Sequence, residues 1–503
     1  MTTAYNHLCT AFTRLSRFEH LSAIAGWDMQ TMMPAKGNLA RSEAMAELNV
    51  LQHQILTAPQ IGEWLKQAEQ ELLDEQSIDE LKLANLREMH RHYHNAVLLP
   101  ESLVEAKSLA GARCEHAWRQ QRIANDWAGF AENLREVVKL SREEAKIRAE
   151  AAGTSGYDAL LNLYEPGTNS ADIDRIFGDL KQWLPALLQK VTTKQQSSEP
   201  CLIPQGPFDL EKQRQLGLSV MKVLGFDFNG GRVDVSVHPF CGGVPQDVRI
   251  TTRYNNQEFL SALMGIVHET GHARYEQNLP REWLGQPIAH ARSTAIHESQ
   301  SLLFEMQLAR SNEFLQVIHP LVIQQFGEQP AFAEHNFIAL NQRVKTGLIR
   351  VDADEVSYPA HVILRYEIEK ALIGGEIDVE DIPALWNEKM QQYLGINTEG
   401  DYRNGCMQDI HWTDGAFGYF PTYTLGAMYA AQLFHAARSA IPALDSHIAN
   451  GNLAPLLNWL QQNIWQHGSR YPTAELITKA TVSPLTPIFP PAFRTPLSLI
   501  FNS

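Results

Sequence analysis

The sequence predicts a mainly α-helical fold that holds one small antiparallel β-sheet, and two patterns carry this prediction. Residues 4–190 and 259–482 space their apolar side chains three and four positions apart, as helices packed on a core do. Residues 226–237 and 247–254 instead alternate apolar and polar side chains, as half-buried strands do. Because both alternating runs lie between the two helical stretches, we expect the sheet just ahead of the second stretch.

Prolines divide the first helical stretch. Residues 77–95 begin with Ser77, a residue type that caps helices, and then place Leu81, Leu83 and Leu86 at helical spacings. Breaks are expected where proline, alone or with glycine, interrupts the pattern, at Met33-Pro34, Leu99-Pro100, Glu165-Pro166-Gly167 and Leu184-Pro185.

The remaining segments set the domain organisation. Residues 192–207 are polar and contain prolines, which indicates a connection or surface loop, and Asn229-Gly230-Gly231 predicts a turn between strands. The last stretch, 483–503, has five prolines and cannot form a regular helix. We therefore expect one domain over residues 1–503, with a helical lobe at about 1–190, a second lobe at about 208–482 and a proline-rich tail.

Composition excludes several classes of protein. The chain has 503 residues, 44% hydrophobic and 20% charged, which is ordinary for a globular protein. Its formal net charge of −15 argues against nucleic acid and anionic membranes as partners. The five cysteines are scattered and never form a C-x-x-C pair, which disfavours disulfides and cysteine metal sites. With no signal peptide at the N-terminus and no spanning segment, the expected location is the cytoplasm.

The pentapeptide His268-Glu269-Thr270-Gly271-His272 is the strongest chemical signal. Histidines four residues apart on a helix share one face, where they can bind one tetrahedral ion. Glu269 is then placed beside the ion, where it can take a proton from metal-bound water. Gly271 allows close packing of a neighbouring element. The alternative is a chance match, because such a string arises by composition in a few per cent of chains of this size.

A third ligand distinguishes a metal centre from a chance histidine pair. Glu298 lies 26 residues beyond His272, which leaves room for a loop (280–287) and a second helix that begins near Ala291. Two histidines and a glutamate with an open fourth position form a catalytic arrangement, and Zn²⁺ is the expected metal, with Co²⁺ or Mn²⁺ as alternatives. Glu298 could equally be an ordinary helical glutamate.

These residues belong to a longer set of motifs, and with it the chain resembles the carboxypeptidase Taq family of metallocarboxypeptidases. The likeness covers about residues 5–480 and follows the family's order. Its six segments are His238-Pro239-Phe240, Asp247-Val248-Arg249-Ile250-Thr251-Thr252, His268 to His272, His297-Glu298-Ser299-Gln300, Ile349-Arg350-Val351-Asp352-Ala353-Asp354, and Gly405-Cys406-Met407-Gln408-Asp409-Ile410-His411-Trp412.

The resemblance implies a single peptidase domain with a helical, saddle-like subunit and a deep groove, similar to the neurolysin and angiotensin-converting-enzyme folds. It implies metal-dependent removal of single C-terminal residues from peptides, and commonly a homodimer. His268, His272 and Glu298 are implied as ligands and Glu269 as the general base. Arg350 and the segment from Gln408 to Trp412 are implied at the end of the groove that holds the peptide's C-terminus. The proline-rich tail departs from the family pattern of a terminal helix.

Further candidates are expected around the substrate. His411, Tyr419 and Tyr423 could supply a second oxyanion donor, and Tyr423 with His411 is the preferred pair, although the tyrosines could simply pack. The Arg350 guanidinium suits a free carboxylate, unless it pairs with Asp352 or Asp354.

His238 and Arg249 are expected on the sheet near the site, where an edge strand could pair with an extended peptide. Structural roles would fit them as well. Two rival functions also stay open. One is an oligopeptidase that cleaves inside short peptides, and the other is a catalytically silent, peptide-binding protein of the same fold.

Overall fold

The computed structural model describes residues 3–73 and 79–485, and helices dominate it as predicted. The first half of the chain forms nine helices within those ranges: α1 (Ala4–Thr31), α2 (Asn38–Thr57), α3 (Pro59–Leu73), α4 (Glu80–Val97), α5 (Glu101–Ile123), α6 (Trp127–Ala152), α7 (Gly156–Tyr164), α8 (Ser170–Gln196) and α9 (Leu210–Val223). Three strands follow: β1 (Gly231–Val235), β2 (Cys241–Val244) and β3 (Asp247–Thr252).

The second half is helical again. Its helices are α10 (Leu260–Glu276), α11 (Thr294–Leu302), α12 (Asn312–Phe326), α13 (Glu334–Asn341), α14 (Tyr358–Gly374), α15 (Ile382–Leu394), α16 (Pro421–Ala440), α17 (Leu444–Ala449), α18 (Ala454–Asn463) and α19 (Thr473–Thr481). A π-helix, Leu303–Leu308, continues α11. Among the described residues, no helix is both long and apolar enough to cross a membrane.

Three of the four predicted proline breaks are present, and the fourth is wrong. Helices α1, α4 and α7 end just before the first three break points, but α8 continues through Pro185 to Gln196. A proline inside a helix costs about 3 kcal/mol. The buried stripe of α8, which includes Leu180, Leu184 and Leu188, spans the proline on one face, and its packing outweighs that cost. The expected connection therefore begins after residue 196.

Helix α4 begins later than the sequence indicates. Asp79 is its N-cap, and the Asp79 carboxylate accepts from the backbone N–H groups of Leu81 and Lys82. The expected cap, Ser77, lies outside the described residues. Most of the proline-rich tail lies outside them too, since the description ends at Leu485.

The small sheet is mixed, and this corrects the predicted antiparallel sheet. Its strand order is β1-β3-β2, with β2 antiparallel and β1 parallel to β3. The segment Cys241–Val244 has no apolar–polar alternation, so the sequence did not predict it as a strand. It forms the hairpin with β3, which leaves only the far edge of β3 for β1. The chain at Asn229-Gly230 therefore leads into β1 instead of turning between two strands.

The sheet packs against one side of α10. Val248 and Ile250 of β3 join Ile266 and Ala273 of α10 in one buried cluster. Ile266 and Ala273 are seven residues apart, so they share one helix face. By the same spacing, His268 and His272 point to the opposite side, away from the sheet.

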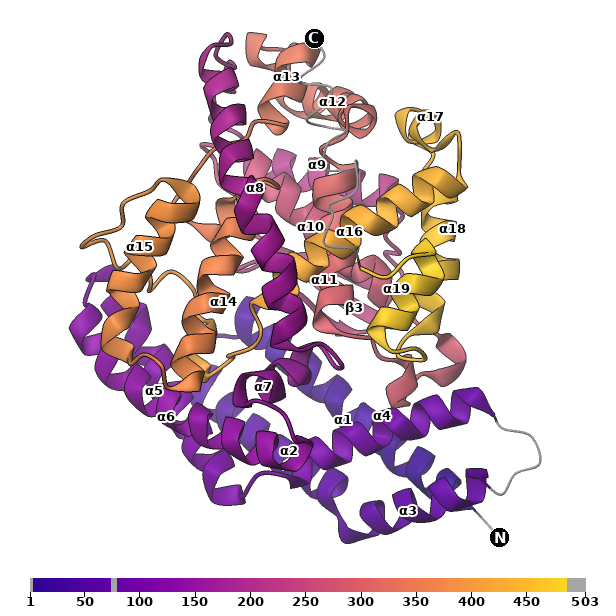
Figure 1. Ribbon diagram of the computed structural model, residues 1–503. Coiled ribbons are helices and arrows are strands. Elements are labelled where there is room, and N and C mark those ends of the chain that lie inside the picture. The colour runs from indigo at the N-terminus through magenta and orange to yellow at the C-terminus, as the bar shows by residue number, and fades with distance from the viewer. Residues whose placement is uncertain (1–2, 74–78, 486–503) are drawn as a thin grey trace.

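Two larger cores surround this unit. One joins α1, α3 and α4 near the N-terminus, and the other runs from α5 to α19. Figure 1 shows α10 and α11 near the middle of the molecule, with the indigo helices α1 to α4 below them and the yellow helices α18 and α19 at the right. The histidine helix is therefore an interior element.

Candidate metal centre

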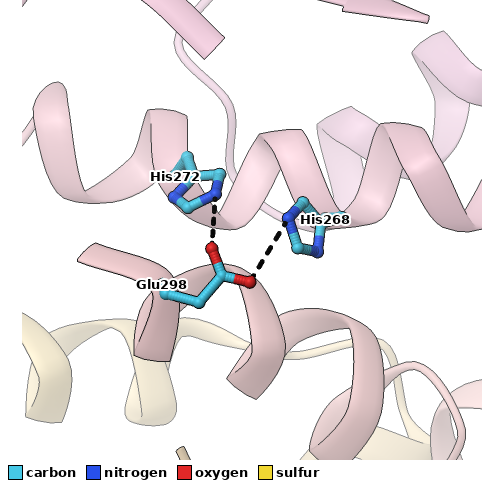
Figure 2. A group of neighbouring side chains, drawn as sticks. All are labelled: His268, His272 and Glu298. Carbon is cyan, nitrogen blue, oxygen red and sulfur yellow. Dashed lines mark ion pairs between the residues drawn. The ribbon is translucent and has the colours of Figure 1, made fainter. Parts of the chain in front are cut away.

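The two histidines of α10 face a glutamate of α11. Figure 2 shows His268 and His272 one turn apart on α10, with Glu298 rising between them from the neighbouring helix. Nε2 of His268 lies 3.9 Å from Glu298 Oε1, and Nε2 of His272 lies 3.5 Å from Glu298 Oε2. The structure thus brings together the three residues that the sequence predicted as ligands.

Two glycines let three helices meet at this point. A Cβ on Gly271 of α10 would lie 2.5 Å from the carbonyl oxygen of Gln300, and a Cβ on Gly426 of α16 would lie 2.9 Å from the Glu298 side chain. Larger residues would therefore push α10 or α16 away from α11. The close packing expected at Gly271 is confirmed, and Gly426 has the same role on the opposite side of α11.

The start of α11 is fixed by two side chains. Ser293 accepts from the backbone N–H of Ile296, and Oε2 of Glu165 accepts from the N–H of Ala295. Glu165 follows α7, more than a hundred residues earlier in the chain, and is fully buried. The helix begins at Thr294, three residues after the expected start, and these caps fix the direction in which Glu298 projects.

The donor set fits a divalent cation. One ligand atom from each of the three residues lies within 4.8 Å of the others. Donors about 2.1 Å from a tetrahedral ion are roughly 3.4 Å apart, so only a small contraction is needed. Burial opposes ionisation of Glu298, but the hydrogen bond from His272 and the charge of His268 lower the pKa of Glu298 to about 2. Two imidazoles and an ionised carboxylate are ligands that Zn²⁺ favours.

Each histidine also makes a contact through Nδ1, the ring nitrogen that faces away from Glu298. Nδ1 of His268 lies 3.0 Å from Oε2 of Glu305, whose other oxygen accepts from Arg310. Nδ1 of His272 lies 2.6 Å from Nδ1 of His297, and Nε2 of His297 lies 2.8 Å from Glu276. In both ligands the Nδ1 atom is therefore engaged, and Nε2 is left to face Glu298.

Glu269 lies beside this centre and is buried. Desolvation raises the pKa of Glu269 to about 7, and the charge of His268 only partly offsets it. A carboxyl group with a pKa near neutrality can both take up and release a proton at physiological pH. Strand β2 packs against α10, and the charge of Glu269 adds to the effect of burial in raising the pKa of the Cys241 thiol.

His411 and Tyr423 form a pair within hydrogen-bond distance of each other. Nε2 of His411 lies 3.0 Å from the Tyr423 hydroxyl. Burial lowers the pKa of His411 to about 4, so the imidazole is neutral beside the tyrosine hydroxyl. Tyr419 packs edge-on against Tyr423, with ring centroids 5.2 Å apart. Burial raises the pKa of both tyrosines, and the negative charge of Glu298 adds to it.

Arg350 pairs with neither aspartate that the sequence offered as an alternative. Its Nη2 lies 2.9 Å from Asp409, and Arg365 binds the other oxygen of Asp409 at 2.5 Å. Nη1 of Arg350 donates to the Tyr358 hydroxyl at 3.3 Å, and the guanidinium stacks 4.5 Å from the centre of the Tyr423 ring. Two buried arginines therefore share one carboxylate.

Gln408 supports this cluster through the backbone. Its Oε1 accepts from the backbone N–H of Arg350 at 2.8 Å. Its Nε2 donates to the carbonyl oxygens of Leu348, Asn404 and Gly405. The amide thus ties the loop before Arg350 to the loop before Asp409, and both of its polar ends are in use.

His238 and Arg249 lie apart from the three ligands. Arg249 makes a two-pronged ion pair with Asp247 and stacks 4.4 Å from the Trp27 ring of α1. His238 is exposed in the segment between β1 and β2, where burial and nearby arginines lower its pKa. Within the part of the chain that the structure describes, neither side chain contacts the ligands.

Sequence reasoning missed four residues of the site, which are Glu276, Glu305, Tyr358 and Arg365. Asp409 lies in the segment that the sequence placed at the end of the groove, but its pairing with Arg350 was not predicted. Glu305 lies seven positions after Glu298, a spacing that returns to the same helix face. That spacing could have indicated Glu305 as a neighbour of the metal site. The position of the Glu305 carboxylate, however, also depends on the π-helix at Leu303–Leu308, which the sequence did not predict. Nothing local indicates Arg365 or Tyr358.

The buried cap of α11 yields a prediction about stability. Burial raises the pKa of Glu165 to about 7 from a value of 4.5 in the unfolded chain. The folded state therefore binds this proton more tightly, and stability falls as the pH rises from about 4.5 to 7. Replacing Glu165 by Gln should remove that component, worth at most about 3 kcal/mol. Melting temperatures at pH 5 and pH 8 should differ less in Glu165→Gln than in the wild type; an equal difference would contradict this.

Comparison with known proteins identifies the family. The chain matches the carboxypeptidase Taq (M32) metallopeptidase family over residues 7–488. Thermostable carboxypeptidase 1 of Thermus thermophilus is 37% identical over 486 residues, which are 95% of this chain and 95% of that protein. Carboxypeptidase 1 of Bacillus subtilis is 35% identical over 470 residues, or 93% of this chain and 92% of that protein.

A solved structure agrees. Metallocarboxypeptidase 1 of Trypanosoma cruzi superimposes with a TM-score of 0.95 at 46% identity and covers 99% of both chains. The likeness thus extends over nearly the whole fold. The chain therefore belongs to the carboxypeptidase Taq (M32) metallopeptidase family and is a metallocarboxypeptidase.

Proposed function

We propose that this enzyme removes single amino acids from the C-termini of peptides with one Zn²⁺ held by His268, His272 and Glu298. The observation that carries the proposal is that the three candidate ligands have two functional groups near them, the Glu269 carboxyl and the Arg350 guanidinium. Glu269 lies beside them, and the cluster of Arg350, Asp409 and Arg365 lies behind Tyr423. A hydrolytic centre beside a buried cationic cluster suits a substrate with a terminal carboxylate.

The metal and Glu269 would divide the work. When bound, the ion supplies Lewis acidity, which lowers the pKa of a coordinated water towards about 7 and polarises the peptide carbonyl. Glu269 takes one proton from the attacking water while the water oxygen bonds to the carbonyl carbon. The same carboxyl then gives that proton to the leaving amine, so the C–N bond breaks with balanced atoms and charges.

Tyr423 and His411 would stabilise the tetrahedral oxyanion. The Tyr423 hydroxyl lies within hydrogen-bond distance of Nε2 of His411 in the free enzyme, which fixes the position of that hydroxyl. The raised pKa keeps Tyr423 protonated, as a donor to an oxyanion must be. Tyr419 supports the Tyr423 ring, and its role as a direct donor is the less favoured assignment.

Replacing Tyr423 by Phe is therefore expected to lower kcat by about 10²-fold, which is typical for the loss of one oxyanion donor. Metal content should stay at the wild-type level, since the hydroxyl is not a ligand. Steady-state kinetics with parallel metal analysis checks this, and Tyr419→Phe is the matched variant. If Tyr419→Phe had the larger effect, the two tyrosines would exchange roles.

Arg350 would hold the carboxylate of the substrate. Its pairing with Asp409 does not cancel the positive charge, because Arg365 shares the same aspartate. One excess positive charge is thus left among these three buried groups, and a peptide carboxylate would neutralise it. Gln408 would position Arg350 through its backbone, which gives it a supporting role instead of direct contact with the peptide.

The direction of cleavage tests the proposal. A peptide with a blocked N-terminus and a free C-terminus should give a ladder of products in mass spectrometry, each one residue shorter. Its C-terminal amide should be cleaved at least about 10²-fold more slowly, since the amide lacks the charge that Arg350 would bind. Equal rates, or products from internal cleavage, would favour the oligopeptidase. Absence of cleavage with metal bound would favour the silent binding protein. The homodimer and the cytoplasmic location stay predictions.

A further inference from the structure

Each histidine ligand has a distinct environment behind it. His268 meets a carboxylate directly, since Glu305 lies 3.0 Å from its Nδ1. Glu305 is anchored by Arg310, whose Nη2 lies 3.2 Å from Glu305 Oε1, and a neighbouring guanidinium favours the ionised carboxylate. An ionised carboxylate can only accept hydrogen bonds, so the proton of a neutral His268 must sit on Nδ1. That leaves the Nε2 lone pair directed at the metal position.

Among the described residues, no carboxylate lies directly against Nδ1 of His272. Its Nδ1 lies 2.6 Å from Nδ1 of His297, whose Nε2 lies 2.8 Å from Oε1 of Glu276. A carboxylate oxygen can only accept a hydrogen bond, so the 2.8 Å contact has Nε2–H of His297 donating to Glu276. A neutral His297 with its proton on Nε2 carries a lone pair on Nδ1. That lone pair accepts the Nδ1 proton of His272, and Nε2 of His272 is again free.

We propose that Glu276 and His297 act as a relay that orients His272 and raises its donor strength toward the metal, as Glu305 does directly for His268. The inference rests on the metal centre proposed above. Glu276 and His297 are positioning residues, because neither contacts the metal position or the substrate. Both histidine ligands would then be hydrogen-bonded to a carboxylate, His268 directly to Glu305 and His272 to Glu276 through the imidazole of His297.

The geometry of the chain favours this arrangement. Glu276 is the last residue of α10, one turn after His272, and His297 precedes Glu298 on α11. The relay therefore links the two helices that carry the three ligands. The rings of His272 and His297 have centroids 4.6 Å apart and planes tilted by 32°. A competing acceptor is the carbonyl oxygen of His297, 3.1 Å from His272 Nδ1. If that carbonyl took the proton, Glu276 would have no influence on the metal.

Metal affinity separates these possibilities without reference to activity. The metal-free protein is titrated with Zn²⁺ against a competing chelator, and the visible spectrum of the Co²⁺ form reports on the ligand field. Glu276→Gln is expected to raise the zinc Kd about tenfold, and His297→Phe to raise it up to about 100-fold, within the range seen for such supporting partners. The double variant should match His297→Phe within a factor of two, because Glu276 acts only through His297.

Two further variants make the result unambiguous. Glu282→Gln is the matched control, since Glu282 is an exposed glutamate in the segment between α10 and α11 and should leave the Kd unchanged. Glu298→Gln tests the proposed site itself and should weaken Zn²⁺ binding far more than the relay variants. If Glu298→Gln had no effect, the metal centre would be wrong. If Glu298→Gln abolished binding but Glu276→Gln changed nothing, or if the two relay effects added in the double variant, the relay would be wrong. If His297→Phe does not fold, the zinc Kd of Glu276→Gln alone decides whether the relay exists.

Discussion

Replacing Glu269 by Gln is expected to lower kcat by about 10³-fold while the protein keeps its metal. The substitution preserves the size of the side chain and removes its ability to take up a proton, which general base catalysis requires. Glu269 is buried and has a pKa raised to about 7. Because the side chain is shielded from solvent, a water molecule from bulk solvent does not easily take over its role as proton acceptor. Because Glu269 is not among the three ligand candidates, the zinc Kd should change little.

Single-turnover kinetics and metal analysis on the same sample check this outcome. Glu282→Gln, the same change on an exposed residue, should retain wild-type kcat. A Glu269→Gln enzyme that kept more than a tenth of the wild-type kcat would mean that another group accepts the proton of the water. Loss of metal together with activity would instead mean that Glu269 helps to hold the ion.

The second large effect concerns Arg350. Replacing Arg350 by Met should lower kcat/KM for peptides with a free C-terminus by 10²-fold or more, on the order of the 3 kcal/mol that a charged hydrogen-bonded contact contributes. The C-terminal amides, already poor substrates, should change little. Asp409 keeps its ion pair with Arg365 in this variant, so it is not left as an unpaired buried charge.

The ratio of kcat/KM for acid and amide is the decisive quantity, because general damage to the site would lower both. Arg438→Met is the control, since Arg438 of α16 also pairs with an aspartate, Asp445 of α17, at 2.8 Å, but both side chains are partly exposed. It should leave the ratio unchanged. If Arg350→Met lowered the acid and amide rates by the same factor, Arg350 would have a structural role and the clamp would have to be sought elsewhere.

The candidate metal ligands could be predicted from the sequence because the pattern that indicates them is local. Two histidines one helical turn apart must share a face, and the motif itself carries that spacing. Glu298 needed only the assumption that the next helix packs beside the first, and Gly271 indicated close packing. The mainly helical fold followed for the same reason, since the spacing of apolar residues reports which side of each helix is buried.

The supporting residues could not be predicted, because their partners are remote in sequence. Arg350 pairs with Asp409, 59 residues away, although Asp352 and Asp354 lie next to it. The turn at Arg350–Asp352 and the packing of Tyr358 decide where the guanidinium points. Strand β2 was missed because Cys241–Val244 has no alternation, and its pairing depends on β3. Pro185 shows the converse case, in which tertiary packing keeps a helix intact through a residue that locally disfavours it.

Titration of the metal-free protein with Zn²⁺ tests the central claim most directly. At each addition, the release of the C-terminal residue from a free-acid peptide is measured alongside bound metal. The account predicts that activity rises in proportion to bound Zn²⁺ and reaches its maximum at one ion per chain, and that a Glu298→Gln protein gains neither metal nor activity. Activity without bound metal, a maximum only at two ions per chain, or full activity in Glu298→Gln would contradict it.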